Sequence, residues 1–165
     1  MFDENGEPTY AQILLWAEVK TTITQITPLL WIGGIPIRYG RVAKEMLDAE
    51  IQVLISTTQR RPHAHHGMEV MRVPFDDHRG HLPDFDLLRP GIDKTREALE
   101  AEKRVLVHCA YGLNRSSLIA SVALHETYGW SGVKISSLIR SRRAGALWNP
   151  AYRAYVEGLE GRGDA

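Results

Sequence analysis

Cysteine is nearly missing from this sequence, since its 165 residues contain only Cys109. A single thiol excludes an intrachain disulfide and favours a reducing compartment, and it leaves no second thiol to protect Cys109 from oxidation. Neither sign of charge is in excess, because 20 Lys and Arg balance 20 Asp and Glu. This balance argues against a general nucleic-acid binder.

Long apolar runs are also lacking, so the sequence offers no membrane-spanning segment. The acidic stretch from Met1 to Pro8 does not have the basic-then-apolar order of a signal peptide. We therefore expect a cytoplasmic protein. Without repeats or linkers, 165 residues of 44% hydrophobic content predict one small domain with one sizeable core.

Strand and helix patterns alternate along the chain. Short β-branched runs predict strands, and apolar residues at helical spacing predict helices. The expected strands are 22–26, 29–32, 51–56, 69–73 and 104–108, and the expected helices are 39–49, 90–102, 116–128, 132–142 and 150–159. This order predicts an α/β fold with a central, mostly parallel sheet of about five strands and helices on both faces.

The chain divides into a main domain, 22–160, an N-terminal extension, 1–21, and a short tail, 161–165. The extension is expected to hold a helix packed on the domain through Tyr10, Ile13, Leu14 and Ala17. An arm that binds a partner is the alternative interpretation.

Residues 105–117, Val-Leu-Val-His-Cys-Ala-Tyr-Gly-Leu-Asn-Arg-Ser-Ser, form the most informative segment. Its first three residues predict a buried strand, and the residues from 116 onward predict a packed helix. The loop between this strand and this helix therefore joins a strand end to a helix start. Gly112 lets successive backbone N–H groups turn inward beside the positive end of that helix. The segment therefore predicts a cradle that fits a phosphate dianion.

Two side chains give this predicted cradle its chemistry. Arg115 offers a planar fork of donors to two phosphate oxygens. The same positive field favours the thiolate of Cys109, which is the strongly nucleophilic form. The pattern indicates nucleophilic attack on a phosphate ester; the alternative is that Cys109 is a buried structural thiol.

The run His-Cys-Ala-Tyr-Gly-Leu-Asn-Arg-Ser resembles the His-Cys-x5-Arg-Ser/Thr signature of the cysteine-dependent protein tyrosine phosphatase superfamily, and the short chain resembles its dual-specificity branch. Other segments agree in order. Residues 26–34 and 51–56 are similar to strands of that branch, 73–77 to its general-acid loop, and 144–152 to the segment with an Asn before the last helix. The resemblance spans roughly residues 22–158.

This resemblance implies a two-step reaction that needs neither metal nor cofactor. Cys109 would attack phosphorus while Arg115 and the loop amides hold the phosphate, and Asp77 would protonate the leaving oxygen. Ser116 would donate to the departing sulfur, and His108 would support the thiolate without transferring a proton. The implied phosphate-binding positions are Ala110, Tyr111, Gly112, Leu113, Asn114 and Arg115.

Two neighbouring carboxylates compete for the role of the acid. Asp77 is the third residue after Pro74 and so matches the position of the acid in the family pattern. Asp76 is the alternative, because adjacent side chains in an extended loop point in opposite directions. Both could also be solvated loop carboxylates.

The substrate is predicted less sharply. A shallow cleft lined by Tyr111 and Trp148, accepting protein phosphotyrosine and phosphoserine or phosphothreonine, is the default expectation. No lysine stands between Cys109 and Arg115, which argues against the phosphoinositide 3-phosphatase pattern. The Gly-Leu-Asn-Arg run containing Asn114 is similar to a Gly-x-Asn-Arg run found in RNA 5′-triphosphatases of the superfamily. An RNA-end phosphatase is therefore the alternative, although the neutral overall charge of the chain argues against binding to RNA. A catalytically silent phosphopeptide-binding module is weakened because nucleophile, arginine and acid are all present.

Two remaining clusters are interpreted as surface features. The run from His63 to His66 is expected to be a polar loop rather than a metal site. Arginines that could gather around a cleft are each expected to be ordinary surface charges: Arg60, Arg61, Arg79, Arg140, Arg142 and Arg143. The sequence predicts no oligomeric state.

Overall fold

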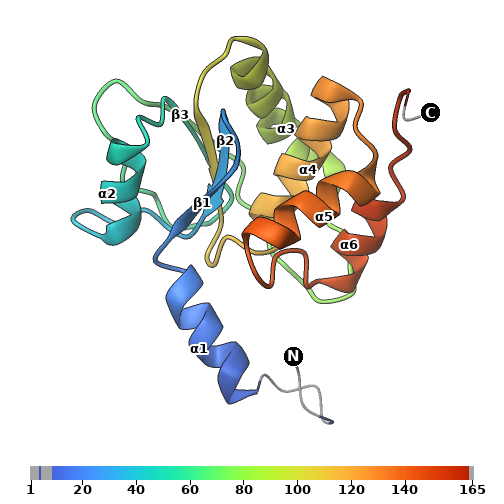
Figure 1. Ribbon diagram of the computed structural model, residues 1–165. Coiled ribbons are helices and arrows are strands. Elements are labelled where there is room, and N and C mark those ends of the chain that lie inside the picture. Colours follow the sequence, from blue (N-terminus) through green and yellow to red (C-terminus); the bar gives the residue numbers. More distant parts are fainter. Residues whose placement is uncertain (1–3, 5–8, 164–165) are drawn as a thin grey trace.

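A computed structural model of the chain describes residue 4 and residues 9–163 (Figure 1). Parts of the expected extension and tail therefore lie outside the described residues. In chain order the elements are α1 (Tyr10–Val19), β1 (Ile23–Thr27), β2 (Leu30–Gly33), α2 (Arg41–Asp48), β3 (Val53–Ser56), β4 (Glu69–Arg72), α3 (Phe85–Glu100), β5 (Val105–His108), α4 (Arg115–Tyr128), α5 (Gly132–Arg142) and α6 (Pro150–Glu157).

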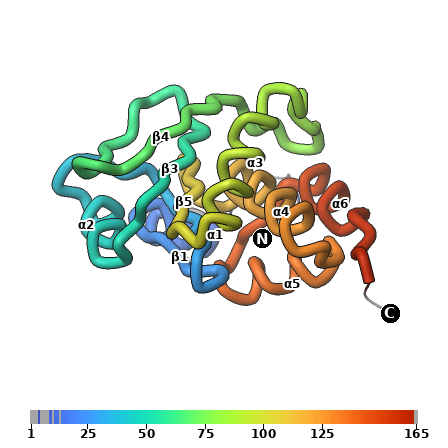
Figure 2. The backbone as a smooth tube through the Cα atoms, turned by 90° about the horizontal axis from the view of Figure 1, so that it is seen from above, coloured from blue at the N-terminus to red at the C-terminus, as the bar shows by residue number. Residues whose placement is uncertain are grey.

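The five strands form one sheet in the order β1-β2-β5-β3-β4. Only the β1–β2 pair is antiparallel; β5 runs parallel to β2 on one side and to β3 on the other. Helix α2 covers one face, and α3 to α6 lie on the opposite side (Figure 2). The predicted α/β fold, with its mostly parallel sheet flanked by helices on both faces, is confirmed. Strand β5 lies in the middle, so the loop that follows it leaves from the carboxyl edge, where such folds place ligands.

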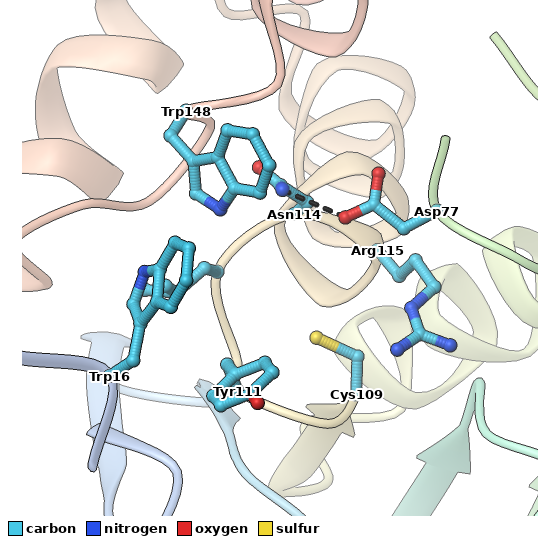
Figure 3. Close-up of a pocket in the computed structure, with 8 residues that line it drawn as sticks. Trp16, Asp77, Cys109, Tyr111, Asn114, Arg115 and Trp148 are labelled. Atoms are coloured by element: carbon cyan, nitrogen blue, oxygen red, sulfur yellow. Dashed lines mark hydrogen bonds between the residues drawn. The ribbon is translucent and has the colours of Figure 1, made fainter. Parts of the chain in front are cut away.

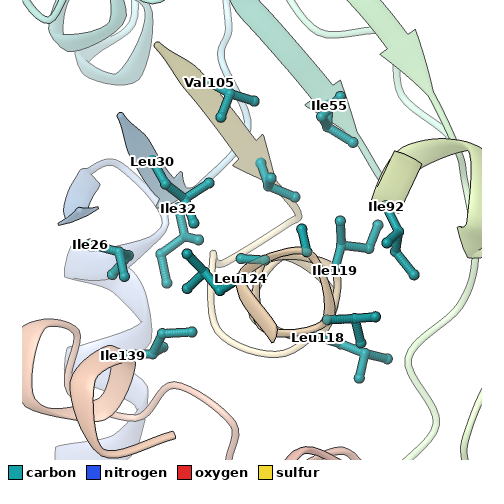
Figure 4. Packing of buried hydrophobic residues seen from close by; sticks show 14 of the residues in the cluster. Ile26, Leu30, Ile32, Ile55, Ile92, Val105, Leu118, Ile119, Leu124 and Ile139 are labelled. Carbon is teal, nitrogen blue, oxygen red and sulfur yellow. The ribbon is translucent and has the colours of Figure 1, made fainter. Parts of the chain in front are cut away.

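Alternation along β5 divides the hydrophobic core into two layers. Val105 and Val107 belong to the larger cluster, in which α4 lies at the centre (Figure 4). Leu106 points to the other face and packs with Val42 and Met46 of α2. All four residues of β5 are buried, and this explains why its sequence is a short apolar run.

Helix α3 begins five residues earlier than the sequence pattern indicated. Pro90 suggested a helix start, but Asp84 supplies the cap by accepting a hydrogen bond from the Asp86 N–H at 2.9 Å. Pro90 therefore lies inside the helix, where it cannot donate to the carbonyl of Asp86. Both residues are exposed, so solvent can satisfy that carbonyl.

Helix α1 forms within the expected extension, but its packing face differs from the prediction. Leu14 is 52% exposed and Ala17 is also exposed. The helix instead buries Gln12 and Val19, and it partly buries Trp16. The choice of face depends on residues far along the chain, described below. The expected contributions of residues 10 and 13 rest on side chains outside the described structure.

Within the described part of the chain, no helix has both the length and the apolar character needed to cross a membrane.

Candidate active site

The loop of residues 109–114, here called the β5–α4 loop, rests against the end of β2. The Cys109 N–H donates to the Gly33 carbonyl at 3.1 Å. Gly112 has a φ of 67°, and a Cβ placed on it would stand 2.5 Å from the Gly33 carbonyl carbon. Position 112 therefore requires glycine both for its left-handed backbone and for this close approach.

Cys109 lies at the base of the loop, with its side chain almost fully buried. The Gly112 N–H donates to its sulfur at 3.1 Å, and the Ser116 hydroxyl lies 3.4 Å from it. Burial alone raises the pKa of the thiol, but the Arg115 charge and the hydrogen bonds from Ser116 outweigh it, so the pKa is lowered. The site favours the thiolate, which is the form that attacks electrophiles.

His108 is buried directly before Cys109 in the chain. Its Nδ1 lies 3.4 Å from the Cys109 carbonyl, and its Nε2 lies 2.8 Å from the Ser56 hydroxyl. A carbonyl can only accept, so Nδ1 carries the hydrogen and Nε2 accepts from Ser56. Burial lowers the pKa of His108 to about 4, with a smaller contribution from the Arg115 charge. The imidazole is therefore uncharged near neutral pH.

Arg115 begins α4 and lies beside Cys109 in the pocket (Figure 3). Its Nη1 donates to the Phe75 carbonyl at 3.1 Å. This bond ties the guanidinium to the segment between β4 and α3, which also carries the candidate acid. The bound guanidinium retains donors that a phosphate could use.

Asp77, and not Asp76, lines the pocket. Its two carboxylate oxygens accept from two amide groups: Oδ2 from Asn114 Nδ2 at 2.8 Å and Oδ1 from Asn149 Nδ2 at 2.7 Å. The Asn149 N–H in turn donates to Asn114 Oδ1 at 3.0 Å. The side chain of Asp76 is exposed and belongs to no part of this pocket. The carboxylate at position 77 is thus held from both sides.

The opposite side of the pocket is aromatic. The ring of Trp16 lies 5.9 Å from that of Tyr111 and 6.0 Å from that of Trp148, centroid to centroid. The pocket has a volume of about 190 Å³ and is lined by Trp16, Asp77, Cys109, Tyr111, Leu113, Asn114, Arg115 and Trp148. Tyr111 and Trp148 were expected there, whereas Trp16 was missed. No local pattern marks it, because α1 meets the loop only through tertiary packing.

Arg143 corrects the expectation of a surface charge, because it is 3% exposed. Its Nη2 donates to the carbonyls of Tyr111 at 2.8 Å and of Val19 at 2.5 Å, and its Nη1 donates to the Thr24 hydroxyl at 2.8 Å. Burial lowers the pKa of Arg143 to about 10, so the guanidinium remains charged at neutral pH. Neighbouring oxygens compensate the lost hydration, which explains how a charge is accommodated there. The other five arginines of that group are exposed.

The predicted loop residues do not all face the same space. Tyr111, Leu113 and Asn114 line the pocket, whereas Gly112 contributes its N–H to the sulfur. Ala110 faces a neighbouring hollow together with Arg41 and Arg60. The pocket therefore brings together the candidate nucleophile Cys109, Arg115 and the candidate acid Asp77, whereas Ala110 faces away from it.

The histidine run, residues 63–66, lies in a loop that contacts α2. His65 Nε2 lies 2.8 Å from the Ala43 carbonyl, and its ring meets that of His63 edge to face at 5.2 Å. Among the residues that the structure describes, no three His, Cys, Asp or Glu side chains are grouped so that they could hold a metal ion.

Comparison with known proteins gives a consistent result. A family model described as "Dual specificity phosphatase, catalytic domain" matches residues 39–159. Human dual specificity phosphatase 28 is 26% identical over 148 residues, covering 86% of this chain and 80% of that protein.

Solved structures agree with this result. The crystal structure of human DUSP28 superimposes with a TM-score of 0.66 at 24% identity, covering 82% of this chain and 90% of that one. The structure of PTPMT1 in complex with PI(5)P gives a TM-score of 0.68 at 19% identity, covering 82% and 92%. At these identities the superpositions establish the fold.

Proposed function

The chain belongs to the dual specificity phosphatases, a family of cysteine-based phosphatases, and we propose that it hydrolyses phosphate monoesters through a phosphocysteine on Cys109. The observation that carries this proposal is the placement of the Cys109 sulfur. It lies within reach of the Gly112 N–H and the Ser116 hydroxyl, beside Arg115, in a pocket that also contains Asp77. Nucleophile, anion-binding donors and an acid thus surround one space.

In the first step the thiolate attacks phosphorus in line. The sulfur–phosphorus bond forms, the bond from phosphorus to the ester oxygen breaks, and Asp77 transfers its proton to that oxygen. The Arg115 guanidinium and the loop N–H groups stabilise the charge on the three equatorial oxygens. The alcohol or phenol then leaves, and Asp77 remains as a carboxylate.

In the second step water replaces the sulfur on phosphorus. Asp77 accepts a proton from the water as its oxygen bonds to phosphorus, and the sulfur departs as a thiolate. The Ser116 hydroxyl, 3.4 Å from the sulfur, stabilises that leaving thiolate. Inorganic phosphate is released and the starting protonation states are restored. His108, uncharged near neutral pH, takes no proton in either step.

We infer that the substrates are phosphorylated proteins, carrying phosphotyrosine as well as phosphoserine or phosphothreonine. Family membership supports phosphorylated substrates in general. The site uses no metal or cofactor in the steps above. Triphosphate-ended RNA, a phosphoinositide and binding without turnover are the competing possibilities that an experiment must separate.

The first experiment measures hydrolysis of an aryl phosphate by the wild-type protein and by Cys109→Ser, in EDTA near pH 6. We expect turnover in the wild type alone, with a loss of about 10⁶-fold in the variant, the scale of removing an enzymic nucleophile. Equal rates in both proteins would contradict the proposal. No turnover in either protein, together with tight binding of a phosphopeptide, would indicate a binding module.

A second panel identifies the substrate class. Phosphotyrosine and phosphothreonine peptides, a triphosphate-ended RNA and a phosphatidylinositol monophosphate in micelles are compared by phosphate release at one ionic strength. We expect the peptides to give the highest kcat/KM. A preference for either of the other substrates would overturn the assignment to phosphoproteins while retaining the phosphatase.

A further inference from the structure

We propose that Trp16, on the N-terminal helix α1, is a specificity-determining residue that makes this pocket select aromatic phosphate esters, phosphotyrosine above all, over alkyl esters. The inference rests on the proposed phosphatase function and narrows its substrate class. It concerns a residue outside the segment 39–159 that the family model matches.

Three rings form one side of the pocket. Trp16 contacts both Tyr111 and Trp148, and together they face Asp77 and Arg115 across the space above Cys109 (Figure 3). They come from three separate parts of the chain: α1, the β5–α4 loop and the segment before α6. Aromatic side chains favour offset or edge contacts with another ring, so this wall provides a surface suited to a planar group.

The position of Trp16 is fixed independently of its own ring contacts. One nitrogen of the buried Arg143 donates both to the Val19 carbonyl, at the end of α1, and to the Tyr111 carbonyl in the β5–α4 loop. Val19 itself is buried. Helix α1 and the β5–α4 loop are thus both bound to Arg143. This shared contact fixes the position of Trp16 relative to Cys109.

The depth of the site gives the wall its selectivity. Cys109 is 3% exposed, whereas Tyr111, which lines the same pocket, is 43% exposed. A phosphotyrosine can reach the sulfur with its phosphate while its ring lies against this aromatic side of the pocket. A phosphoserine is shorter, so the peptide backbone would have to approach the aromatic side of the pocket and lose water from its N–H and C=O groups. The wall therefore favours the longer, aromatic ester and disfavours the shorter one.

The test compares Trp16→Leu with Leu14→Ala, a control on the exposed face of the same helix. Two peptides of one sequence, differing only in phosphotyrosine or phosphoserine, are assayed for kcat/KM. We expect Trp16→Leu to lower the phosphotyrosine-to-phosphoserine ratio by roughly 3- to 10-fold, the scale of one aromatic pair. Trp16→Phe should recover most of the ratio, and Leu14→Ala should leave it unchanged.

Two readouts keep the proposal open to refutation. Inhibition by inorganic phosphate should be retained in Trp16→Leu, because Trp16 lies on α1, outside the loop that supplies the N–H groups. A weakened inhibition would mean that Trp16 only supports the loop. An unchanged ratio would also overturn the proposal. The same ratio, measured by peptide binding in a Cys109→Ser background, decides the role of Trp16 even if the wild type hydrolyses neither peptide. An absence of hydrolysis of both peptides by the wild type would contradict the proposed function and would leave the role of Trp16 in binding to be decided by this ratio.

Discussion

The two sides of the pocket are built in different ways. On the polar side, Asp77 and Arg115 are held by directed hydrogen bonds, with donor-to-acceptor distances of 2.7 to 3.1 Å. On the aromatic side, the ring of Trp16 packs against those of Tyr111 and Trp148 at centroid distances near 6 Å. Proton and phosphoryl transfer depend on positions fixed to within a fraction of an ångström, whereas a ring surface tolerates small displacements. We therefore expect the rate of hydrolysis to depend mainly on the polar side, and the choice of substrate to depend mainly on the aromatic side.

The strongest test of this comparison removes the acid from the polar side. Asp77→Ala should lower kcat/KM for an alkyl phosphate by roughly 10²- to 10⁴-fold, because a poor leaving group needs the proton. The loss should be much smaller for an activated aryl phosphate. A series of esters with leaving groups of graded pKa measures the difference.

Asp76→Ala is the matched control for that measurement. It removes the neighbouring, exposed carboxylate and should leave the dependence on the leaving group unchanged. Equal losses on all esters in Asp77→Ala, or a loss concentrated in Asp76→Ala, would show that the acid has been assigned to the wrong residue.

A smaller effect is expected when the support of the acid is removed. Asn114→Ala deletes one of the two amide donors to Asp77 and should lower kcat/KM for an alkyl phosphate by roughly 10- to 100-fold, through misplacement of the proton donor. In an Asp77→Ala background the same change should cost almost nothing. Additive losses in this double-mutant cycle would mean that Asn114 acts on the phosphate instead of on the acid.

The smallest effect is expected for Ser116, which contacts Cys109 at the base of the pocket. Because the pKa of Cys109 is lowered, the thiolate should persist as pH falls below the usual thiol range. Ser116→Ala removes a hydrogen bond to the thiolate, so the pKa should rise and the reactive fraction at pH 6 should fall. We expect alkylation by iodoacetamide at pH 6 to slow by roughly tenfold. An unchanged alkylation profile would refute this role of the hydroxyl.

Local patterns explain what the sequence could predict. The β5–α4 segment is a strand, a loop and a helix in direct succession, so the order of residues alone was enough to place Cys109 at the start of the loop and Arg115 directly after its end. The same holds for the sheet and for most helices. Asp77 lies on another segment, and it was selected over Asp76 only by resemblance to the family pattern. Its two amide partners, Asn114 and Asn149, follow no spacing rule that would reveal the contact.

Non-local contacts explain the errors. The side of α1 that packs against the domain is the side that contacts Tyr111 and Trp148, which lie far along the chain. Because this short helix has apolar residues on more than one side, its sequence alone does not predict which side is buried. Arg143 was expected on the surface because arginine side chains are mostly exposed in folded proteins. Its burial depends on oxygens from α1, β1 and the β5–α4 loop converging on one point, which only the folded chain creates.

The buried guanidinium of Arg143 also affects how the pocket around Cys109 attracts anions. Together with Arg115 it places two positive charges near the single thiol group of Cys109, in a chain whose overall charge is zero. Low-dielectric walls concentrate such a field at the mouth of a cleft instead of spreading it over the surface. We therefore expect small tetrahedral oxyanions such as sulfate or arsenate to compete with the substrate for this site, so that a higher concentration of them lowers the rate of hydrolysis.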